Sequence, residues 1–492
     1  MESVIGLVVG LFCVFLVLLK KINGWYIESK LEKTTRSLLP PGDFGFPFIG
    51  NMLSFLKAFK SNNPDRFIDS YTNRYGRIGM YKAFMFGSPT ILITAPEKAK
   101  QMLMGEEIFI PGWPKATTKL IGDKSFIAIS IERHRRLRKM TAAPINGYDA
   151  LSTYLAFIEE ATISSLNKWF RIGSEIEFLT ELRRFTFGII MHIFLSTEGS
   201  SIITGLEQAY TDLNCGIRAM AINIPGFAYH KALGARRKLV EILRSVLDAR
   251  RKRKELVAGK NNKNGKDMMD RLMEVEDENG LKLGDEEIVD ILIMYLNAGH
   301  ESSAHITMWA TVFLQENPLI FRKAKEEQEE IRRSMISTSQ KHLSLKEIKK
   351  MEYLSKVIDE TLRLVNISFV TFREATEDTN VDGYLIPKGW KVQIWARSIH
   401  LDSSVYSNPK QFDPSRWEGV IPKPGTFIPF GAGARLCPGN ELAKLEISVF
   451  LHYFLLDYRM KRVNPKCPIR YLPHPRPKDN CLATISRSSC TD

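Results

Sequence analysis

The most informative stretch of the 492-residue sequence is Phe430-Gly431-Ala432-Gly433-Ala434-Arg435-Leu436-Cys437-Pro438-Gly439. A single cysteine, Cys437, stands in this glycine-rich loop, directly before a segment with apolar residues at helical spacing. The beginning of a helix favours negative charge, so Cys437 is placed to be a thiolate. The glycines let the backbone approach a bulky, flat group. The stretch therefore predicts a metal-binding thiolate beside a large cofactor, in preference to a structural cysteine in a tight turn.

The same loop contains the complete pattern F-x-x-G-x-R-x-C-x-G. With it, the sequence resembles the cytochrome P450 haem-thiolate monooxygenases over nearly its whole length. In such proteins the thiolate donates electron density to haem iron and favours cleavage of the O–O bond. The resemblance implies that Cys437 is the axial ligand of haem b iron and that Arg435 pairs with a haem propionate. It places Phe430 and Gly439 in the haem-binding loop.

The hydrophobic pattern predicts helices over most of residues 145–360, and strands with turns around residues 77–95 and 365–440. This distribution agrees with the fold that the resemblance implies, the cytochrome P450 fold, which is mostly α-helical with a smaller β region. We expect one N-terminal transmembrane helix to precede it.

One predicted helix is unusually long, because helical periodicity runs from residue 285 to about residue 315. Its first turn, Asp285-Glu286-Glu287, is acidic, as the helix dipole favours. Its middle contains Ala298-Gly299-His300-Glu301-Ser302-Ser303, and an interior glycine costs about 1 kcal/mol relative to alanine, so it needs a packing or functional reason. His300 and His305 would lie on different faces of this helix, so we interpret both as structural.

The resemblance supplies a functional reason for that glycine. It implies that the helix opens beside the haem at Ala298 and Gly299, where dioxygen binds and an acid–alcohol pair relays protons. Glu301 matches the acid. Ser302 stands where the family usually has threonine, so the hydroxyl is kept but the methyl group that fixes its rotamer is lost. We therefore predict that Glu301 and Ser302 are catalytic.

A structural network is predicted around Glu360 and Arg363, which form an E-x-x-R motif on a helix. Such a pair alone is common and stabilises a helix by only about 0.2–0.5 kcal/mol. The resemblance implies that both residues join Arg416 in a buried network that supports the haem loop.

Basic residues upstream are further candidates for haem binding. His134 and Arg138 lie four positions apart and hence on one face of a helix. The resemblance implies that both bind haem propionates, with His134 replacing the family's usual tryptophan, and that Arg373 does the same. The alternative is that these side chains are ordinary surface charges.

The N-terminal segment indicates a membrane anchor. Residues 4–19 are uninterrupted apolar sequence, closed by Lys20 and Lys21 and followed by Trp25 and Tyr26. Positive charge after the apolar run favours a cytosolic location for the rest of the chain. An acidic start and the lack of a small-residue cleavage site argue against a cleaved signal peptide. The predicted organisation is an anchor over residues 1–21, a linker over residues 22–43 with a Pro-Pro-Gly hinge, and a haem-binding monooxygenase domain over residues 44–492.

Charge and cysteine usage narrow the class of protein. The formal charge is +14, with 44% hydrophobic and 25% charged residues, as in an ordinary globular protein. Six cysteines without a CxxC pair exclude zinc fingers and a disulfide scaffold. No nucleic-acid-binding pattern accompanies the basic residues, so we expect an anionic membrane and an acidic partner, NADPH–cytochrome P450 reductase. We predict that the basic run at residues 250–254 is part of a solvated loop.

The predicted substrate contacts, at residues 111–129, 291–298, 365–370 and 475–480, contain many apolar or small residues, which suits a rigid hydrocarbon. Within the family, the chain most resembles the plant ent-kaurenoic acid oxidases of gibberellin biosynthesis. The strings that carry this resemblance are residues 22–26, 225–230 and 294–303. Two departures, residues 366–371 and Ala396 in place of phenylalanine, are closer to the sister β-amyrin oxidases of triterpenoid metabolism.

We therefore expect a monooxygenase of the endoplasmic reticulum membrane, single-pass and with a cytosolic catalytic domain. It would use O2 and NADPH-derived electrons to oxidise a C–H bond of a polycyclic terpenoid, either ent-kaurenoic acid or a triterpenoid. Two other functions remain open: a haem-thiolate isomerase or lyase that acts without a reductase, and a terpenoid or haem carrier without enzymatic activity.

Overall fold

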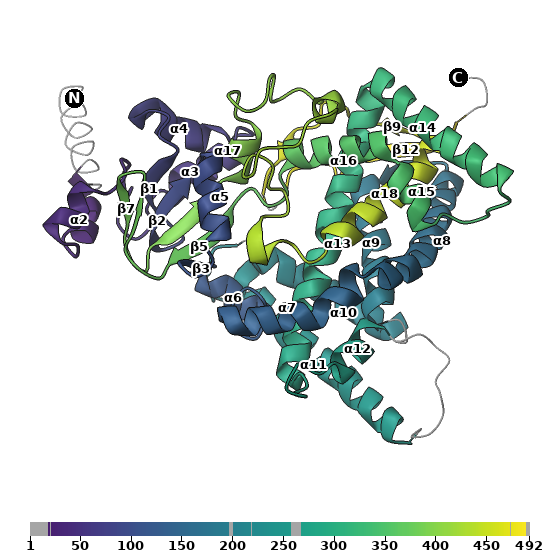
Figure 1. The fold of residues 1–492 in the computed structure, drawn as a ribbon, viewed down its shortest axis with the longest axis horizontal. Helices are drawn as coiled ribbons and strands as arrows, with labels where there is room; N and C mark the ends of the chain where they lie inside the picture. The colour runs from purple at the N-terminus through teal and green to yellow at the C-terminus, as the bar shows by residue number, and fades with distance from the viewer. Residues whose placement is uncertain are drawn as a thin grey trace, which may run out of the picture.

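The computed structural model describes residues 18, 19, 21–195, 200–217, 219–256, 267–472 and 474–488. Helices dominate it, and most of the strands gather at one end, as Figure 1 shows. The helices are α2 Lys33–Ser37, α3 Met52–Lys60, α4 Arg66–Tyr75, α5 Pro96–Met104, α6 Lys115–Ile121, α7 Ile131–Asn146, α8 Tyr148–Ile172, α9 Phe178–Leu195, α10 Ser200–Ile217, α11 Ala228–Leu256, α12 Met268–Glu274, α13 Asp285–Glu316, α14 Pro318–Ser337, α15 Leu345–Lys350, α16 Glu352–Val365, α17 Ala396–His400 and α18 Asn440–Asp457, with 3₁₀ turns η1 Pro414–Trp417 and η2 Gly433–Arg435.

The strands form one larger sheet and several small ones. The five-stranded sheet has the order β1-β2-β8-β5-β3, with β2 parallel to β8 and the other neighbours antiparallel. A three-stranded sheet, β4-β12-β9, and two hairpins, β6–β7 and β10–β11, complete the set. The strands are β1 Met80–Met85, β2 Ser88–Ile93, β3 Phe109–Pro111, β4 Ile176–Glu177, β5 Thr371–Ala375, β6 Thr379–Val381, β7 Tyr384–Ile386, β8 Lys391–Ile394, β9 Tyr458–Arg462, β10 Ile469–Arg470, β11 Arg476–Pro477 and β12 Leu482–Arg487.

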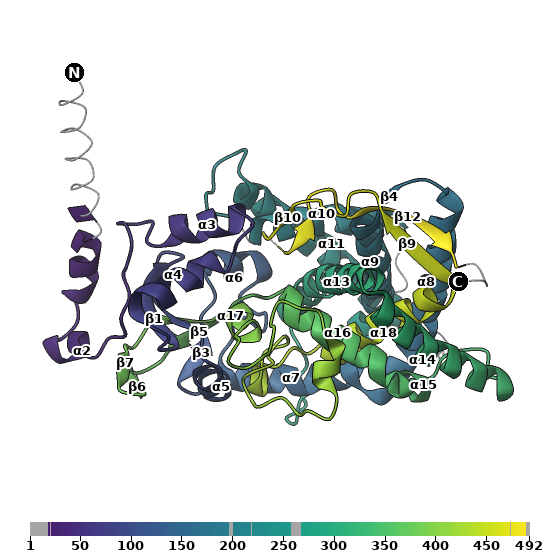
Figure 2. The ribbon, with the colours of Figure 1, turned by 90° about the horizontal axis from the view of Figure 1, so that it is seen from above.

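The long helix α13 crosses the helical part of the molecule and packs against α9, α16 and α18, as Figure 2 shows. Its bounds, Asp285–Glu316, confirm the predicted range of residues 285–315. Most of its side chains are buried in the main core, together with residues of α8, α9 and α18. This central position explains why its sequence is apolar on more than one face, because a helix surrounded by other elements has no fully solvated side.

The prediction that residues 250–254 belong to a loop is wrong, although residues 251–254 are exposed as expected. The rest of the predicted loop, residues 259–266, lies outside the described residues. Residues 250–254 belong to the last turns of α11, and Arg250 is buried, with Nη1 2.7 Å from Asp267 Oδ1. A buried arginine is stabilised when a carboxylate accepts its hydrogen bonds, which explains how a basic residue fits inside here. Between residues 365 and 440 the predicted strands and turns are confirmed, but they also include the short helix α17.

Of the predicted membrane anchor, residues 1–21, the structure describes residues 18, 19 and 21, and the rest lies outside the described residues. Among the residues that the structure does describe, no helix is long and apolar enough to cross a membrane. The Pro-Pro-Gly segment of the predicted linker is attached to the sheet: Lys82 of β1 donates its N–H to the Pro41 carbonyl oxygen at 3.1 Å.

Candidate functional site

The cysteine loop turns tightly in front of α18. The N–H of Cys437 donates to the carbonyl oxygen of Phe430 at 2.9 Å, which closes the loop on itself. Gly433 has φ +70°, and a Cβ there would lie 2.5 Å from the Leu103 carbonyl oxygen, so only glycine fits. Gly439 immediately precedes α18. The chain therefore presents the Cys437 sulfur at the beginning of a buried helix.

Two effects oppose each other at the Cys437 thiol. Burial is the larger effect and raises the pKa of the thiol, while the N–H of Gly439 and the charge of Arg138 oppose this shift in part. Arg138 is half-buried on α7. Its charge acts on the Cys437 sulfur, so the structure brings this predicted propionate-binding residue near the cysteine although the two lie far apart in sequence. The surroundings of the sulfur therefore contain two groups that favour the thiolate form.

Four basic side chains gather beside the loop. Arg435 donates to the Phe126 carbonyl oxygen at 2.9 Å, and Arg373, on β5, donates to that of Phe372 at 3.1 Å. Burial lowers the pKa of both guanidinium groups to about 10, and the charge of Arg435 adds to this effect at Arg373. Burial and the neighbouring arginines lower the pKa of His134 to about 4, so this imidazole is neutral at physiological pH.

This group of basic side chains lacks enough negative charge. Glu106 is the carboxylate that acts on it, and Glu106 already pairs with Arg135 at 2.7 Å. Within the described part of the chain, Nη2 of Arg435 and Nδ1 of His134 are buried without a hydrogen-bond partner. Buried charged and polar groups are costly unless they are paired. The arrangement therefore fits a bound anion beside the cysteine loop.

The middle of α13 has one accessible face. Ala298 is exposed and Ser302 is half-buried, whereas the helix on both sides of them is largely buried. The Ser302 hydroxyl donates to the Ala298 carbonyl oxygen at 2.9 Å. Gly299 is turned toward α9, where a Cβ would lie 2.9 Å from Ile190 Cδ1. Close packing against α9 thus explains why residue 299 is a glycine. Contact between Gly299 and a cofactor stays a prediction.

Glu301 points toward α9 and makes an ion pair that the sequence did not indicate. Its Oε2 lies 3.2 Å from Arg183 Nε, and the imidazoles of His300 and His305 lie 3.9 and 3.6 Å from its carboxylate oxygens. Burial lowers the pKa of both histidines, to about 3 for His305, so both are neutral. Among the described residues, no group of three His, Cys, Asp or Glu side chains could hold a metal ion.

Comparisons with known proteins decide the family. The sequence model of the family described as cytochrome P450 matches residues 40–476. The chain belongs to the cytochrome P450 family. It is 62% identical to the ent-kaurenoic acid oxidase of Oryza sativa subsp. japonica, over 96% of this chain and 92% of that protein. It is 49% identical to a 7,8-epoxymelianol synthase of Ailanthus altissima, over 98% of this chain and 96% of that protein.

A solved structure also matches this cytochrome P450. The retinoic-acid-bound cyanobacterial CYP120A1 superposes with a TM-score of 0.81 at 27% sequence identity, covering 92% of this chain and 99% of that one. The fold class is therefore confirmed as the cytochrome P450 fold, and the chain is a P450 monooxygenase.

The residues present fit the haem that this family binds. A haem carries two propionates, and the group formed by His134, Arg138, Arg373 and Arg435 lacks the negative charge that two carboxylates would supply. The charge of Arg138 acts on the Cys437 sulfur, so the residue that would bind the haem iron lies beside this group. The structure thus brings all five residues, which come from α7, β5 and the cysteine loop, to one place.

The three residues of the predicted structural network meet in the P450 core. Arg363 Nε and Nη2 each lie 2.8 Å from a carboxylate oxygen of Glu360, and Arg416 Nε lies 2.9 Å from Glu360 Oε1. Arg363 also donates to the carbonyl oxygens of His400, Pro409 and Gln411. These bonds join α16 to the chain that leads toward the cysteine loop.

A second ion pair ties the predicted substrate segment at residues 111–129 to two long helices. Arg236 of α11 lies 2.6 Å from Asp290 of α13 and also donates to the Ile121 carbonyl oxygen at 2.9 Å. The N–H of Lys124 donates to the other oxygen of Asp290 at 3.0 Å. We call these contacts the Arg236–Asp290 clamp. Sequence reasoning missed it, because no local pattern marks either residue.

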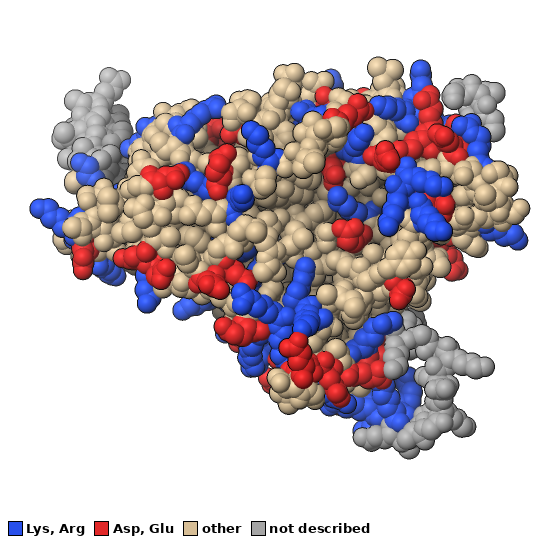
Figure 3. Space-filling view, in the orientation of Figure 1, with Lys and Arg blue, Asp and Glu red and all other residues tan. Residues whose placement is uncertain are grey.

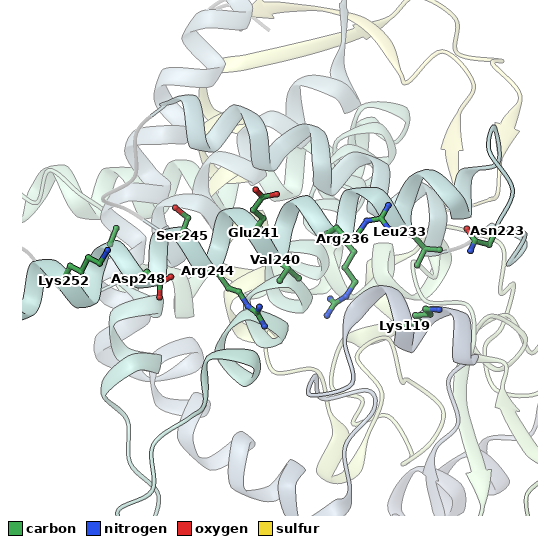
Figure 4. Close-up of a pocket in the computed structure, with 12 residues that line it drawn as sticks. Lys119, Asn223, Leu233, Arg236, Val240, Glu241, Arg244, Ser245, Asp248 and Lys252 are labelled. Carbon is green, nitrogen blue, oxygen red and sulfur yellow. The ribbon is translucent and has the colours of Figure 1, made fainter.

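A groove with a volume of about 1030 Å³ runs along α11 (Figure 4). Its lining is mostly charged, with Arg236, Arg244, Asp248 and Lys252 along the helix and Lys119 of α6 opposite. None of the predicted haem-binding or catalytic residues contributes to it. A charged, open groove of this kind does not suit a hydrocarbon substrate.

Proposed function

We propose that this cytochrome P450 oxidises ent-kaurenoic acid, using O2 and electrons that pass from NADPH through NADPH–cytochrome P450 reductase. The observation that carries the proposal is the 62% identity, over 96% of the chain, to a protein named ent-kaurenoic acid oxidase. The relative named for 7,8-epoxymelianol, a different product, is less similar, at 49% identity.

Two residues of the sequence departures that favoured a triterpenoid substrate, Ala396 and Asn366, have structural roles. Ala396 is 2% exposed and packs in the core behind the five-stranded sheet, so it does not enlarge a substrate pocket. Asn366 ends α16 in the left-handed conformation, with φ +50°, and its side chain donates to the Arg363 carbonyl oxygen at 2.7 Å. Asparagine is one of the few residues that adopt this conformation readily. At these two positions, the changes are therefore compatible with ent-kaurenoic acid.

In the proposed reaction, Cys437 would bind the haem iron, and His134, Arg138, Arg373 and Arg435 would hold the propionates. The bound haem supplies the oxygen chemistry, in which its thiolate ligand favours O–O cleavage. The chain itself supplies protons through Glu301 and Ser302, which stand on the same stretch of α13. The 2.9 Å bond from Ser302 to Ala298 positions the hydroxyl on the accessible face of this helix.

The proposed location is the endoplasmic reticulum membrane, with residues 1–21 as a single anchor and the catalytic part in the cytosol. Exposed aromatic side chains near the N-terminus support it: Trp25 is 70% exposed and Phe48 is 94% exposed. For the reductase, α7 offers the exposed basic side chains of Arg133, Arg135 and Lys139. Figure 3 shows Lys and Arg side chains gathered over this part of the surface, with acidic residues beside them.

The test uses microsomes that contain the full chain and a plant reductase. Ent-kaurenoic acid and a panel of tetracyclic and pentacyclic triterpenoids are supplied with NADPH, and oxygenated products are identified by mass spectrometry. We expect conversion of ent-kaurenoic acid that requires both NADPH and reductase, and no conversion by the Cys437→Ala variant. Conversion of triterpenoids alone would overturn the substrate, and turnover without NADPH would point to an isomerase or lyase.

A further inference from the structure

Three arginines lie together where the β10–β11 hairpin approaches α9 and α13. Arg470 and Arg476 are directly opposite each other in this hairpin. Arg183, on α9, is near enough to lower the pKa of Arg476, and so is Arg470. The carboxylate in this group is Glu301, which lies 3.2 Å from Arg183. In the part of the chain that the structure describes, the charges of Arg183 and Arg470 thus oppose that of Glu301 at Arg476.

Arg476 has an unsatisfied hydrogen-bond donor in this group. Its side chain is half-buried, and its Nη1 is fully enclosed without a hydrogen-bond acceptor among the residues that the structure describes. Burial is the main cause of its lowered pKa, and the attraction of Glu301 opposes the shift only in part. An enclosed N–H group without an acceptor is costly, because its lost hydration is not replaced. Its position would be stabilised by an anion that binds beside it.

The place of Arg476 connects it to the predicted substrate contacts. The hairpin is held against α13 by Trp309, whose indole N–H donates to the Pro475 carbonyl oxygen at 2.8 Å. His474 contacts the Ile367 carbonyl oxygen at 3.2 Å. Ile367 belongs to the predicted substrate segment at residues 365–370, and Arg476 belongs to the one at residues 475–480. The hairpin therefore brings the two segments together. Glu301, which precedes Ser302 on α13, is near enough to Arg476 to affect its pKa.

We propose that Arg476, with Arg183 beside it, forms a binding site for the carboxylate group of the substrate. This inference rests on the proposed function, because ent-kaurenoic acid carries one carboxylate on a hydrocarbon skeleton. A guanidinium presents its N–H groups as a planar fork that matches a carboxylate. In an otherwise apolar pocket, one such contact fixes the orientation of the ligand. Arg476 would thereby determine which C–H bond faces the haem.

The experiment compares ent-kaurenoic acid with its methyl ester, which keeps the skeleton but has no charge. Both ligands are titrated into the full-length holoenzyme, and binding is followed by the change in the haem absorption spectrum. We expect the wild type to bind the acid about 10- to 100-fold more tightly than the ester. We expect Arg476→Gln to remove this preference and Arg476→Lys to restore part of it. Lys478→Gln, an exposed basic residue of the same segment, is the matched control and should keep the preference.

The possible failures are distinguishable. A wild type that converts the acid but binds acid and ester equally would overturn the carboxylate site and leave the proposed function intact. A preference for the acid that survives in Arg476→Gln would also overturn it. A wild type that neither binds nor converts the acid would overturn the proposed function itself. If Arg476→Gln fails to retain haem, the comparison of acid and ester in the wild type decides the question.

Discussion

Ser302 donates its hydroxyl hydrogen bond to the carbonyl oxygen of Ala298, one turn earlier in α13, at 2.9 Å. The same contact recurs further along the helix, from Thr307 to Ser303 and from Thr311 to Thr307, each at 2.8 Å. Thr307 and Thr311 are buried, whereas Ser302 stands on the accessible face with Ala298. Hydrogen bonds of this kind replace or share the helix's own bonds and bend it slightly. Ser302 lies one position away from the row formed by Ser303, Thr307 and Thr311, and its accessible position is what the proposed proton transfer requires.

We predict that Ser302→Ala lowers the rate of product formation by about 100-fold, the order of magnitude of a lost proton donor. NADPH consumption should continue, because electron delivery does not need this hydroxyl. The ratio of product formed to NADPH oxidised measures the effect. Ser302→Thr keeps the hydroxyl and should retain the wild-type ratio. An unchanged ratio in Ser302→Ala would remove Ser302 from the proposed proton path.

Arg373 provides a test of the propionate site. We predict that Arg373→Gln loses haem to a scavenger protein about tenfold faster than the wild type, because one charge-assisted hydrogen bond is missing. Arg133→Gln removes an exposed charge on α7 and serves as the control, with no expected change. Equal rates of haem loss in Arg373→Gln and the wild type would contradict the assignment of Arg373.

The sequence predicted best what depends on local pattern. The acidic turn at residue 285 and the apolar periodicity after it gave the bounds of α13 to within one residue at each end. Arg250 shows the limit. Within its basic run it has the pattern of a solvated residue, yet Asp267 provides a buried partner from beyond the end of the helix. Local composition carries no information about a pairing of that kind.

In the candidate site, too, local motifs identified some residues, whereas their tertiary partners could not be predicted. The motifs located Cys437, Arg435 and Glu301, because each stands at a fixed spacing within a recognisable string. Arg183, the ion-pair partner of Glu301, carries no such mark, and it lies on a different helix far earlier in the chain. Only the packing of α9 against α13 brings the two together. Tertiary contacts of this kind determine the orientation of the Glu301 side chain. Sequence motifs can therefore identify this residue but cannot predict where its carboxylate points.

The Arg236–Asp290 clamp leads to a prediction about substrate binding. Arg236→Met leaves the buried Asp290 carboxylate without its cation, which costs about 3 kcal/mol for a pair of this kind. Residues 111–129 should then be held less firmly, so we expect KM to rise more than kcat falls. Arg237→Met changes the exposed neighbouring residue and is the matched control. A selective loss of kcat would show that the clamp acts on catalysis and not on the substrate segment.

Glu446 of α18 provides a prediction about pH. It is completely buried, and burial raises its pKa from 4.5 to about 8, while the nearby Ser303 hydroxyl opposes the shift. The folded protein therefore keeps a proton on Glu446 at pH values where the unfolded chain has lost it. Between these two pKa values the free energy of unfolding should fall as pH rises, by about 1.4 kcal/mol per pH unit from this residue alone.

Glu446→Gln removes this titration, because its amide carries no charge at any of these pH values. We expect the thermal-unfolding midpoint of the variant holoenzyme, relative to that of the wild type, to rise steadily from about pH 5.5 to about pH 8. Glu441→Gln changes an exposed carboxylate in the first turn of the same helix, so its difference from the wild type should stay constant over this range. A constant difference for Glu446→Gln as well would mean that Glu446 is ionised in the folded protein, and that a cation or water reaches it between α13 and α18.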